Sequence, residues 1–352
     1  MAAPQVLINA IGCAVPPHDV HQAFIDWAEA QIVDSRERAL FRRMADRSGI
    51  DHRWSVLPEG HSPTAPGGFY GAGMPPTSER MRVYAEEAPA LALAAIARLR
   101  EQVALDGISH LVVASCTGFV APGIDQIVAD ALGLVGVERT LVGFMGCYAA
   151  VAALRTARHI VRSEPEARVL VVTVELSSLH LQDDHAIEPL LAMLQFADGA
   201  AAALVTADGE GLAIGRPFAV QLPDSAKLIR WTIGDTGFVM HLSGEVPGRI
   251  QAALRDEAVR AELTGEQRPA DIALWAVHAG GRSILDAVEH GLDLAPDDLA
   301  TSRAVLARHG NMSSSTLMFI LADLLAAPSA GDGVALAFGP GLAAEGFRFQ
   351  RA

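Results

Sequence analysis

The chain has 352 residues, of which 51% are hydrophobic and 19% are charged, a composition typical of a globular protein with one large core or two fused domains. A formal net charge of −14 argues against nucleic acid as a partner. The three cysteines lie too far apart for a disulfide framework and fit a reducing cytoplasm. No lysine or arginine precedes Arg36 and the apolar runs are short, so we expect a cytoplasmic protein with no signal peptide or membrane segment.

Short β-branched runs alternate with helical patterns, which is typical of an α/β fold with buried sheets. In the first half, strands are expected at 6–11, 111–115, 169–174 and 200–205, and helices at 86–100, 123–132 and 149–162. In the second half, strands at 272–277 and 334–338 alternate with helices at 250–262, 282–290 and 313–325. The stretch 57–78, rich in proline and glycine, predicts a surface loop. Each half contains a strand that enters a turn opening a helix, which indicates duplication with a site where the halves meet.

Cys147 follows Gly146 at the end of an apolar run and directly precedes the expected helix at 149–162. A thiol at such a turn faces the free N–H groups and the dipole of the helix, which favour the reactive thiolate. We therefore expect a nucleophile with a lowered pKa. A buried structural cysteine explains this segment equally well.

Two further polar residues stand at the ends of apolar elements. His278 precedes Ala279-Gly280-Gly281, and Asn311 precedes an apolar helix; alone, they read as a core histidine and a helix cap. Together with Cys147 they favour acyl transfer through a thioester, because a histidine can pair with a thiolate and an asparagine can donate to an oxyanion. Papain-like proteases share the order Cys, His, Asn, but the chain lacks their cysteine signature near the N-terminus.

These residues lie in segments that resemble the type III polyketide synthases, the chalcone-synthase-like branch of the thiolase superfamily, over nearly the whole chain. The turn at 115–119 is similar to that of the bacterial members. The resemblance implies a thiolase-like α/β fold with five αβαβα layers built from two similar halves, 1–208 and 209–352. The motifs that carry it are Gly146-Cys147-Tyr148-Ala149-Ala150, 168–175, Phe196-Ala197-Asp198-Gly199, His278-Ala279-Gly280-Gly281, Gly310-Asn311-Met312-Ser313-Ser314 and Phe338-Gly339-Pro340-Gly341.

The resemblance also implies a reaction. Cys147 in the first half would take an acyl starter from coenzyme A, while His278 and Asn311 in the second half would bind malonyl-CoA and stabilise the enolate formed as CO₂ leaves. Decarboxylative Claisen condensations and a cyclisation would then give a pyrone or a phenolic ring. The implied substrates are an acyl-CoA starter and malonyl-CoA, with no bound cofactor, no metal and no membrane partner, in a homodimer.

Further positions match the substrate-binding parts of that family. Arg43 and Arg47 match residues that contact the CoA phosphates; both belong to a local cluster of arginines at 36–53. Trp231 stands where the plant enzymes have a small glycine, so we expect a narrower cavity that disfavours a coumaroyl-type starter. The matched cavity positions are Cys116, Phe196, Trp231, Met240 and Ser313, of which Phe196 guards the junction with the CoA tunnel.

Several polar and acidic residues are interpreted as structural rather than catalytic or metal-binding. His180-Leu181-Gln182-Asp183-Asp184-His185 has metal-ligand residue types, but a polar loop is the better interpretation because no further ligand pattern lies nearby. Glu175 and Asp198 are interpreted as structural hydrogen-bonding groups. Two alternative functions stay open: a condensing enzyme like ketoacyl-ACP synthase III, which uses an acyl carrier protein and stops after one condensation, and a catalytically silent thiolase-fold partner subunit.

Overall fold

A computed structural model describes residues 4–58 and 63–351. Its centre is a nine-stranded sheet in the order β11-β12-β13-β8-β1-β7-β6-β4-β5. The two parts of the sheet are joined where β1 meets β8, through the pairs Leu7↔Ala213 and Ile8↔Leu212. The strands are β1 (Leu7–Ala14), β4 (His110–Ser115), β5 (Glu138–Gly143), β6 (Val169–Leu176), β7 (Asp198–Thr206), β8 (Leu212–Gln221), β11 (Leu274–Val277), β12 (Gly331–Gly339) and β13 (Ala343–Arg351).

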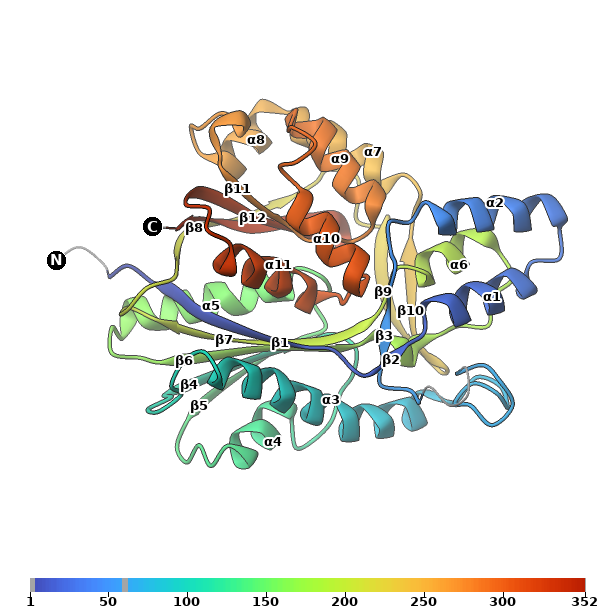
Figure 1. Cartoon of the computed structure of the whole chain (residues 1–352), viewed down its shortest axis with the longest axis horizontal. Coiled ribbons are helices and arrows are strands. Elements are labelled where there is room, and N and C mark those ends of the chain that lie inside the picture. Colours follow the sequence, from blue (N-terminus) through green and yellow to red (C-terminus); the bar gives the residue numbers. More distant parts are fainter. Residues whose placement is uncertain (1–3, 59–62, 352) are drawn as a thin grey trace.

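The helices complete the expected five-layered αβαβα arrangement, which is confirmed (Figure 1). Helices α5 (Ala149–Ser163) and α11 (Ser314–Ala326) lie between the two parts of the sheet. Helices α3 (Thr77–Arg100) and α4 (Ile124–Ala131) cover one outer face. The other outer face carries α7 (Val246–Arg255), α8 (Glu257–Thr264) and α9 (Arg282–Leu292), while α10 (Ala300–His309) packs beside α11 and against β11.

Both faces of the central strands are buried, as the unbroken apolar runs predict. Along β6, Val169 and Val171 pack into the core that contains α5 and α11, whereas Leu170 and Val172 pack into the core beneath α3. The period of two along a strand produces this division. The expected boundary between the halves falls in the turn between β7 and β8.

Several segments differ from the expectation. The helix expected at 250–262 is two helices, because Asp256 caps a new one by accepting from the backbone N–H groups of Ala258 (3.0 Å) and Val259 (3.1 Å). The loop expected at 57–78 includes residues 59–62, which lie outside the described residues, and α3 already begins at Thr77. The strands β8 and β13 and the helix α10 were not expected. Other elements that were not expected are β2 (His18–Asp19), α1 (His21–Gln31), α2 (Ser35–Asp46), β3 (Trp54–Ser55), α6 (Ile187–Met193) and the hairpin β9 (Ile229–Gly234) and β10 (Gly237–Leu242).

No helix among the described residues combines the length and the apolarity that a membrane span requires.

Candidate active site

Cys147 lies in the tight turn between β5 and α5, as its sequence context predicts. Gly146 has φ +77, a left-handed conformation that glycine adopts without strain. A Cβ atom at this position would lie 2.4 Å from Cδ of Pro340, so the 339–341 loop packs directly on the nucleophile turn. The absence of a side chain at Gly146 therefore lets the two segments that flank the sulfur approach each other.

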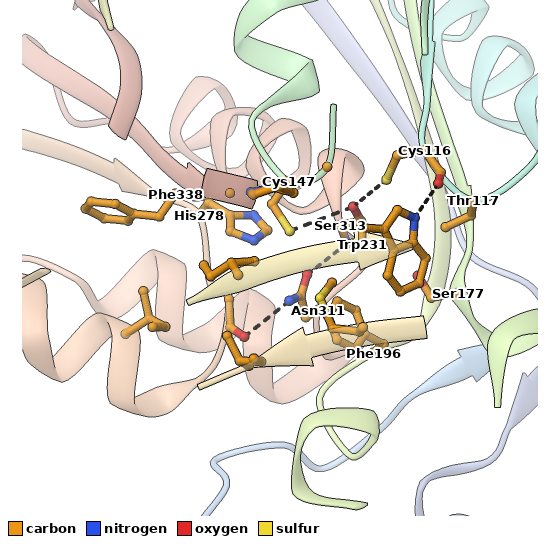
Figure 2. Close-up of a pocket in the computed structure, with 18 residues that line it drawn as sticks. Cys116, Thr117, Cys147, Ser177, Phe196, Trp231, His278, Asn311, Ser313 and Phe338 are labelled. Atoms are coloured by element: carbon orange, nitrogen blue, oxygen red, sulfur yellow. Dashed lines mark hydrogen bonds between the residues drawn. The ribbon is translucent and has the colours of Figure 1, made fainter. Parts of the chain in front are cut away.

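One small cavity of about 50 Å³ brings the catalytic candidates together, and we call it the inner cavity. In Figure 2 the side chains of Cys147, His278 and Asn311 approach this cavity from three different segments of the chain. All eight predicted catalytic and cavity residues line it, namely Cys116, Cys147, Phe196, Trp231, Met240, His278, Asn311 and Ser313.

Asn311 is fixed by four hydrogen bonds, one of which its carbonyl accepts from the backbone N–H of Ala197 at 2.9 Å. Its backbone N–H donates to the carbonyl of Gln195 at 2.8 Å, and its side-chain Oδ1 accepts from the backbone N–H of Ser313 at 2.8 Å. Its Nδ2 donates to the carbonyl of Gly280 at 3.2 Å, in the turn that follows His278. A carboxamide nitrogen carries two hydrogens, and the second N–H lies beside the Cys147 sulfur, where it is available to an oxygen that enters the cavity.

His278 is buried, and neither of its ring nitrogens has a hydrogen-bond partner among the described residues. Burial alone lowers the pKa of His278 to about 3, so its imidazole is neutral at physiological pH. A neutral imidazole carries both a free acceptor and a free donor. It can therefore receive a proton from a thiol or donate a hydrogen bond to a carbonyl oxygen.

The expected lowering of the Cys147 pKa is wrong for the protein without substrate. Burial raises the pKa of Cys147 from 9.0 to about 12, and the Glu175 carboxyl acts in the same direction. The Ser313 hydroxyl, whose Oγ lies 3.8 Å from the sulfur, opposes this shift without cancelling it. The resting nucleophile is thus a thiol that must lose its proton during the reaction.

Glu175 organises the wall behind the sulfur. This buried carboxyl accepts hydrogen bonds from the backbone N–H of Cys116 (3.0 Å), the Thr117 hydroxyl (2.8 Å) and the Ser314 hydroxyl. It therefore ties the turn after β4 to the start of α11. Ser313 is placed between the two cysteines, with its Oγ 3.1 Å from Cys116 Sγ, by a backbone φ of 48.

The hairpin β9–β10 closes the inner cavity on a second side. Trp231 and Met240 face each other across the hairpin, and the Trp231 indole N–H donates to the carbonyl of Cys116 at 2.9 Å. Both residues, with Ser177 and Phe196, also line a neighbouring outer cavity of about 370 Å³. These four side chains thus form the partition between a small reaction space and a larger one.

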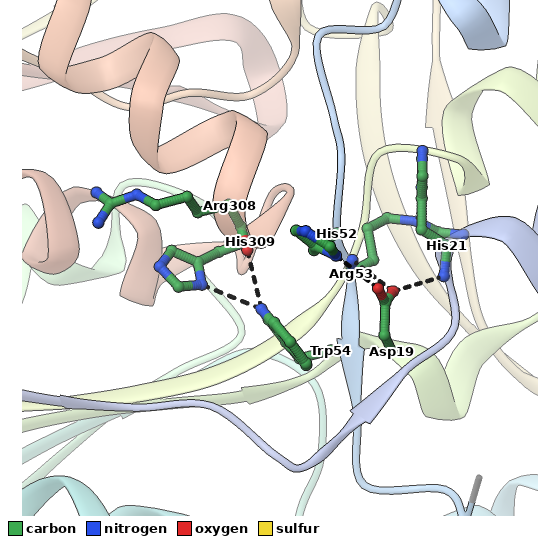
Figure 3. Close-up of polar contacts among 7 residues, drawn as sticks. All are labelled: Asp19, His21, His52, Arg53, Trp54, Arg308 and His309. Carbon is green, nitrogen blue, oxygen red and sulfur yellow. Dashed lines mark hydrogen bonds and ion pairs between the residues drawn. The ribbon is translucent and has the colours of Figure 1, made fainter.

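Sequence reasoning missed a group of contacts made by Asp19, Arg53 and Trp54, which we call the clamp (Figure 3). The clamp holds the segments that carry Phe196 and Asn311 from outside the cavity. Arg53 is buried, and its Nη1 donates to the carbonyls of Phe196 (2.8 Å) and Met193 (3.2 Å). The Trp54 indole N–H donates to the carbonyl of Arg308 (2.9 Å) and to Nδ1 of His309 (3.1 Å), at the end of the helix that precedes Asn311. Asp19 holds this segment through the backbone N–H of Arg53 at 3.2 Å. The contacts join residues far apart in sequence, so no local pattern reveals them.

The structure does not bring Arg43 and Arg47 into either cavity. Both are exposed on α2 and at its C-terminal end. Arg47 nevertheless lies next to the catalytic turn, because Nη1 of Arg282, the first residue of α9, donates to its carbonyl at 3.2 Å.

His180 is not part of a polar surface loop. It is buried at the end of a short 3₁₀ helix (Ser177–His180), where Nε2 donates to the carbonyl of Thr117 at 2.6 Å and Nδ1 accepts from the backbone N–H of Phe238 at 3.0 Å. Both ring nitrogens are thus used within the protein. Over residues 4–58 and 63–351, no cluster of metal-ligating side chains occurs.

Comparison with known proteins agrees with this geometry. Residues 1–209 match the N-terminal domain and residues 217–351 the C-terminal domain of the chalcone and stilbene synthases. An "alpha-pyrone synthesis polyketide synthase-like Pks18" of Mycobacterium tuberculosis is 34% identical over 288 residues, which span 77% of this chain and 73% of that protein.

Two solved structures superpose on the whole chain. PKS-I from the brown alga Ectocarpus siliculosus has a TM-score of 0.89 and 28% identity, with all of both chains covered. The C-terminal type III polyketide synthase domain of Steely1, a type I/III hybrid from Dictyostelium, has a TM-score of 0.88 and 26% identity, with 99% of each chain covered. The chain therefore belongs to the chalcone and stilbene synthase family and is a type III polyketide synthase with a thiolase-like fold.

Proposed function

We propose that Cys147, His278 and Asn311 catalyse decarboxylative condensation of malonyl-CoA onto an acyl starter bound to Cys147. The observation that carries this proposal is their convergence on one buried cavity, together with the free nitrogens of His278 and the spare N–H of Asn311. A silent partner subunit has no need for an unpartnered buried imidazole, which is costly to maintain.

In the loading step, the Cys147 sulfur attacks the thioester carbonyl of the acyl-CoA starter, and His278 accepts the thiol proton. The carbon–sulfur bond to coenzyme A breaks, and His278 returns the proton to the departing thiolate. Because the pKa of free Cys147 is about 12, this proton transfer accompanies the attack on the carbonyl. The acyl group is then held on Cys147.

In the extension step, the bond between the malonyl carboxylate and the α-carbon breaks and CO₂ leaves. The electron pair moves into an enolate, whose oxygen receives hydrogen bonds from His278 and from the spare Asn311 N–H. Donors that are already in place cost no reorganisation when this charge develops. The enolate carbon attacks the acyl carbonyl on Cys147, the sulfur leaves, and a β-ketoacyl-CoA is formed.

We propose that repeated extension ends in cyclisation to a pyrone, with a phenolic ring as the alternative. The similarity to a relative named for alpha-pyrone synthesis supports the pyrone. The chain belongs to a family of enzymes that use coenzyme A thioesters, so we propose these as substrates, with no resident cofactor and with Arg43 and Arg47 holding the CoA phosphates.

We further propose that the enzyme is a cytoplasmic homodimer. Its three free cysteines support a reducing compartment. Strand β5 stands at the edge of the sheet, with exposed Phe119 and Leu141 nearby, and such an edge is suited to contact with a second copy.

The test is mass spectrometry of products formed from malonyl-CoA with acetyl-, long-chain acyl- and aromatic acyl-CoA starters. Wild-type protein should release cyclised products of more than one extension, and Cys147→Ala should release none. Products that stop after one condensation would instead support the ketoacyl-ACP synthase III-like alternative.

A further inference from the structure

One side of α2 carries a row of exposed cationic and apolar side chains. The row recurs every three or four residues, so its members lie on one face of the helix. The opposite side buries Phe41 and Ala45 against α1 and α6. We call the exposed row the α2 face; it consists of Arg36, Leu40, Arg43, Met44 and Arg47.

The charges of the α2 face are not used inside the protein. Among the described residues, the side chains of Arg36, Arg43 and Arg47 form no ion pair or hydrogen bond. Their neighbour Arg42 shows the contrast, since it pairs with Glu29 at 3.1 Å. In a chain of net charge −14, three unpaired arginines on one helix face form a local surface suited to an acidic partner.

The centre of the α2 face is apolar. Leu40 is 37% exposed and Met44 is 44% exposed, and both lie between arginines on the helix surface. Methionine and arginine are enriched at protein–protein interfaces, where a mixed apolar and cationic surface excludes water around a few anchors. Binding of phosphate groups alone would not require the apolar side chains of Leu40 and Met44.

The α2 face leads to the catalytic turn. Its C-terminal residue, Arg47, accepts through its carbonyl from Arg282, and Arg282 directly follows the turn that carries His278 and Gly280. Gly280 and Ile284, on either side of Arg282, line the inner cavity. A ligand seated on the α2 face therefore lies beside a segment that lines the inner cavity.

The cationic residues of the α2 face are spread along the whole helix. Arg36 and Arg47 are eleven residues apart, which is about 16 Å along a helix. From these observations, and resting on the proposed condensation chemistry, we infer that the α2 face docks an acidic, helical acyl carrier protein that delivers the starter on its phosphopantetheine arm. The carrier shares the arm with coenzyme A but adds an acidic surface for Arg36 and an apolar surface for Leu40 and Met44.

The test compares binding and starter delivery in the full-length protein. The probe is phosphopantetheinylated acyl carrier protein from bacterial fatty-acid synthesis, titrated into wild type and into Arg36→Glu/Leu40→Glu. Wild type should bind with a Kd of roughly 1–100 µM, and the double variant should bind at least about tenfold more weakly. Arg100→Glu is the matched control, because Arg100 is exposed at the far end of α3 and has no ion pair in the described part of the chain.

Condensation from CoA starters is measured on the same samples and serves as the folding control. Unchanged CoA kinetics in the double variant, with weaker carrier binding, supports the inference. The inference is overturned if wild type does not bind the carrier, or if the double variant binds it as tightly as wild type. It is also overturned if the double variant loses CoA kinetics in parallel with carrier binding, or if its sedimentation mass changes while carrier binding does not. If no sample condenses CoA starters, the proposed function fails, while the carrier titration still decides the docking surface.

Discussion

Replacing Asn311 by aspartate separates two roles that the structure gives to this residue. Aspartate keeps the oxygen that accepts from the Ser313 N–H at 2.8 Å, so the local turn is retained. It loses Nδ2, which removes both the bond to the Gly280 carbonyl and the spare N–H that faces the cavity. Loss of one oxyanion donor costs about 2.7–4 kcal/mol in the transition state, so malonyl-CoA decarboxylation should fall by roughly 10²–10³.

Loading of Cys147 forms no enolate and should fall much less, by roughly tenfold at most, since the thiol and His278 are unchanged. Release of labelled CO₂ from malonyl-CoA measures decarboxylation, and intact-protein mass spectrometry measures acyl-Cys147. Asn311→Ala is the comparison, because it also leaves the Ser313 N–H without its acceptor and should lower the free energy of unfolding by a further 1–3 kcal/mol or so. Equal losses of loading and decarboxylation in Asn311→Asp would refute the assignment of Asn311 to the enolate.

Three other predictions test the surroundings of the site. Gly146→Ala should lower the free energy of unfolding by about 2–4 kcal/mol in urea titrations, because the new methyl group overlaps the Pro340 ring and φ is strained. Gly341→Ala is the comparison: its φ is +75 and no atom lies within 4 Å of a new Cβ, so it should show the backbone strain alone. Trp54→Phe removes the indole donor at the end of α10 and should slow decarboxylation several-fold more than loading; equal slowing would argue for a general structural defect. Buried neutral histidines bind protons only when unfolded, so their contribution to stability should be complete above about pH 7.5 and fall by about 3 kcal/mol between pH 6.5 and 5.5 in urea titrations, a fall that His278→Ala should reduce by roughly a third. A pH-independent unfolding free energy over this range would contradict the burial of these rings, which are His21 (pKa about 4), His180 (about 3) and His278 (about 3).

The catalytic residues could be predicted from the sequence because each stands at the end of a short, strongly apolar segment. The apolar runs before Cys147 and His278 indicate strands, and the glycines beside them identify turns. The strands that precede them, β5 and β11, stand at opposite ends of the strand order, so it was the repeated strand–turn–helix pattern of the two halves that indicated a shared site. The alternation along β6 was predictable from its unbroken apolar run.

The supporting parts of the site depend on contacts that no local pattern encodes. Trp54 reaches Arg308 across 254 residues, and the pairing of Trp231 with Met240 depends on the register of a half-exposed hairpin. Helix α2 escaped prediction because only Phe41 and Ala45 on it are buried, too few for a clear apolar period. The clamp and the partition between the two cavities could therefore be identified only once the chain was folded.

The raised pKa of Cys147 shows that burial and the helix N-terminus act in opposite directions on the thiol, and that burial is the stronger effect. A helix N-terminus stabilises a negative charge by about 0.3–1 kcal/mol, and by about 2 kcal/mol in favourable partly buried geometry. A shift of the Cys147 pKa from 9.0 to about 12 corresponds to roughly 4 kcal/mol in the opposite direction, so burial outweighs the helix. The sequence reveals the helix but not the closed cavity around the sulfur. The same exclusion of water that would protect an enolate from protonation keeps Cys147 protonated at rest, and for this reason the unpaired imidazole of His278 is needed to accept its proton.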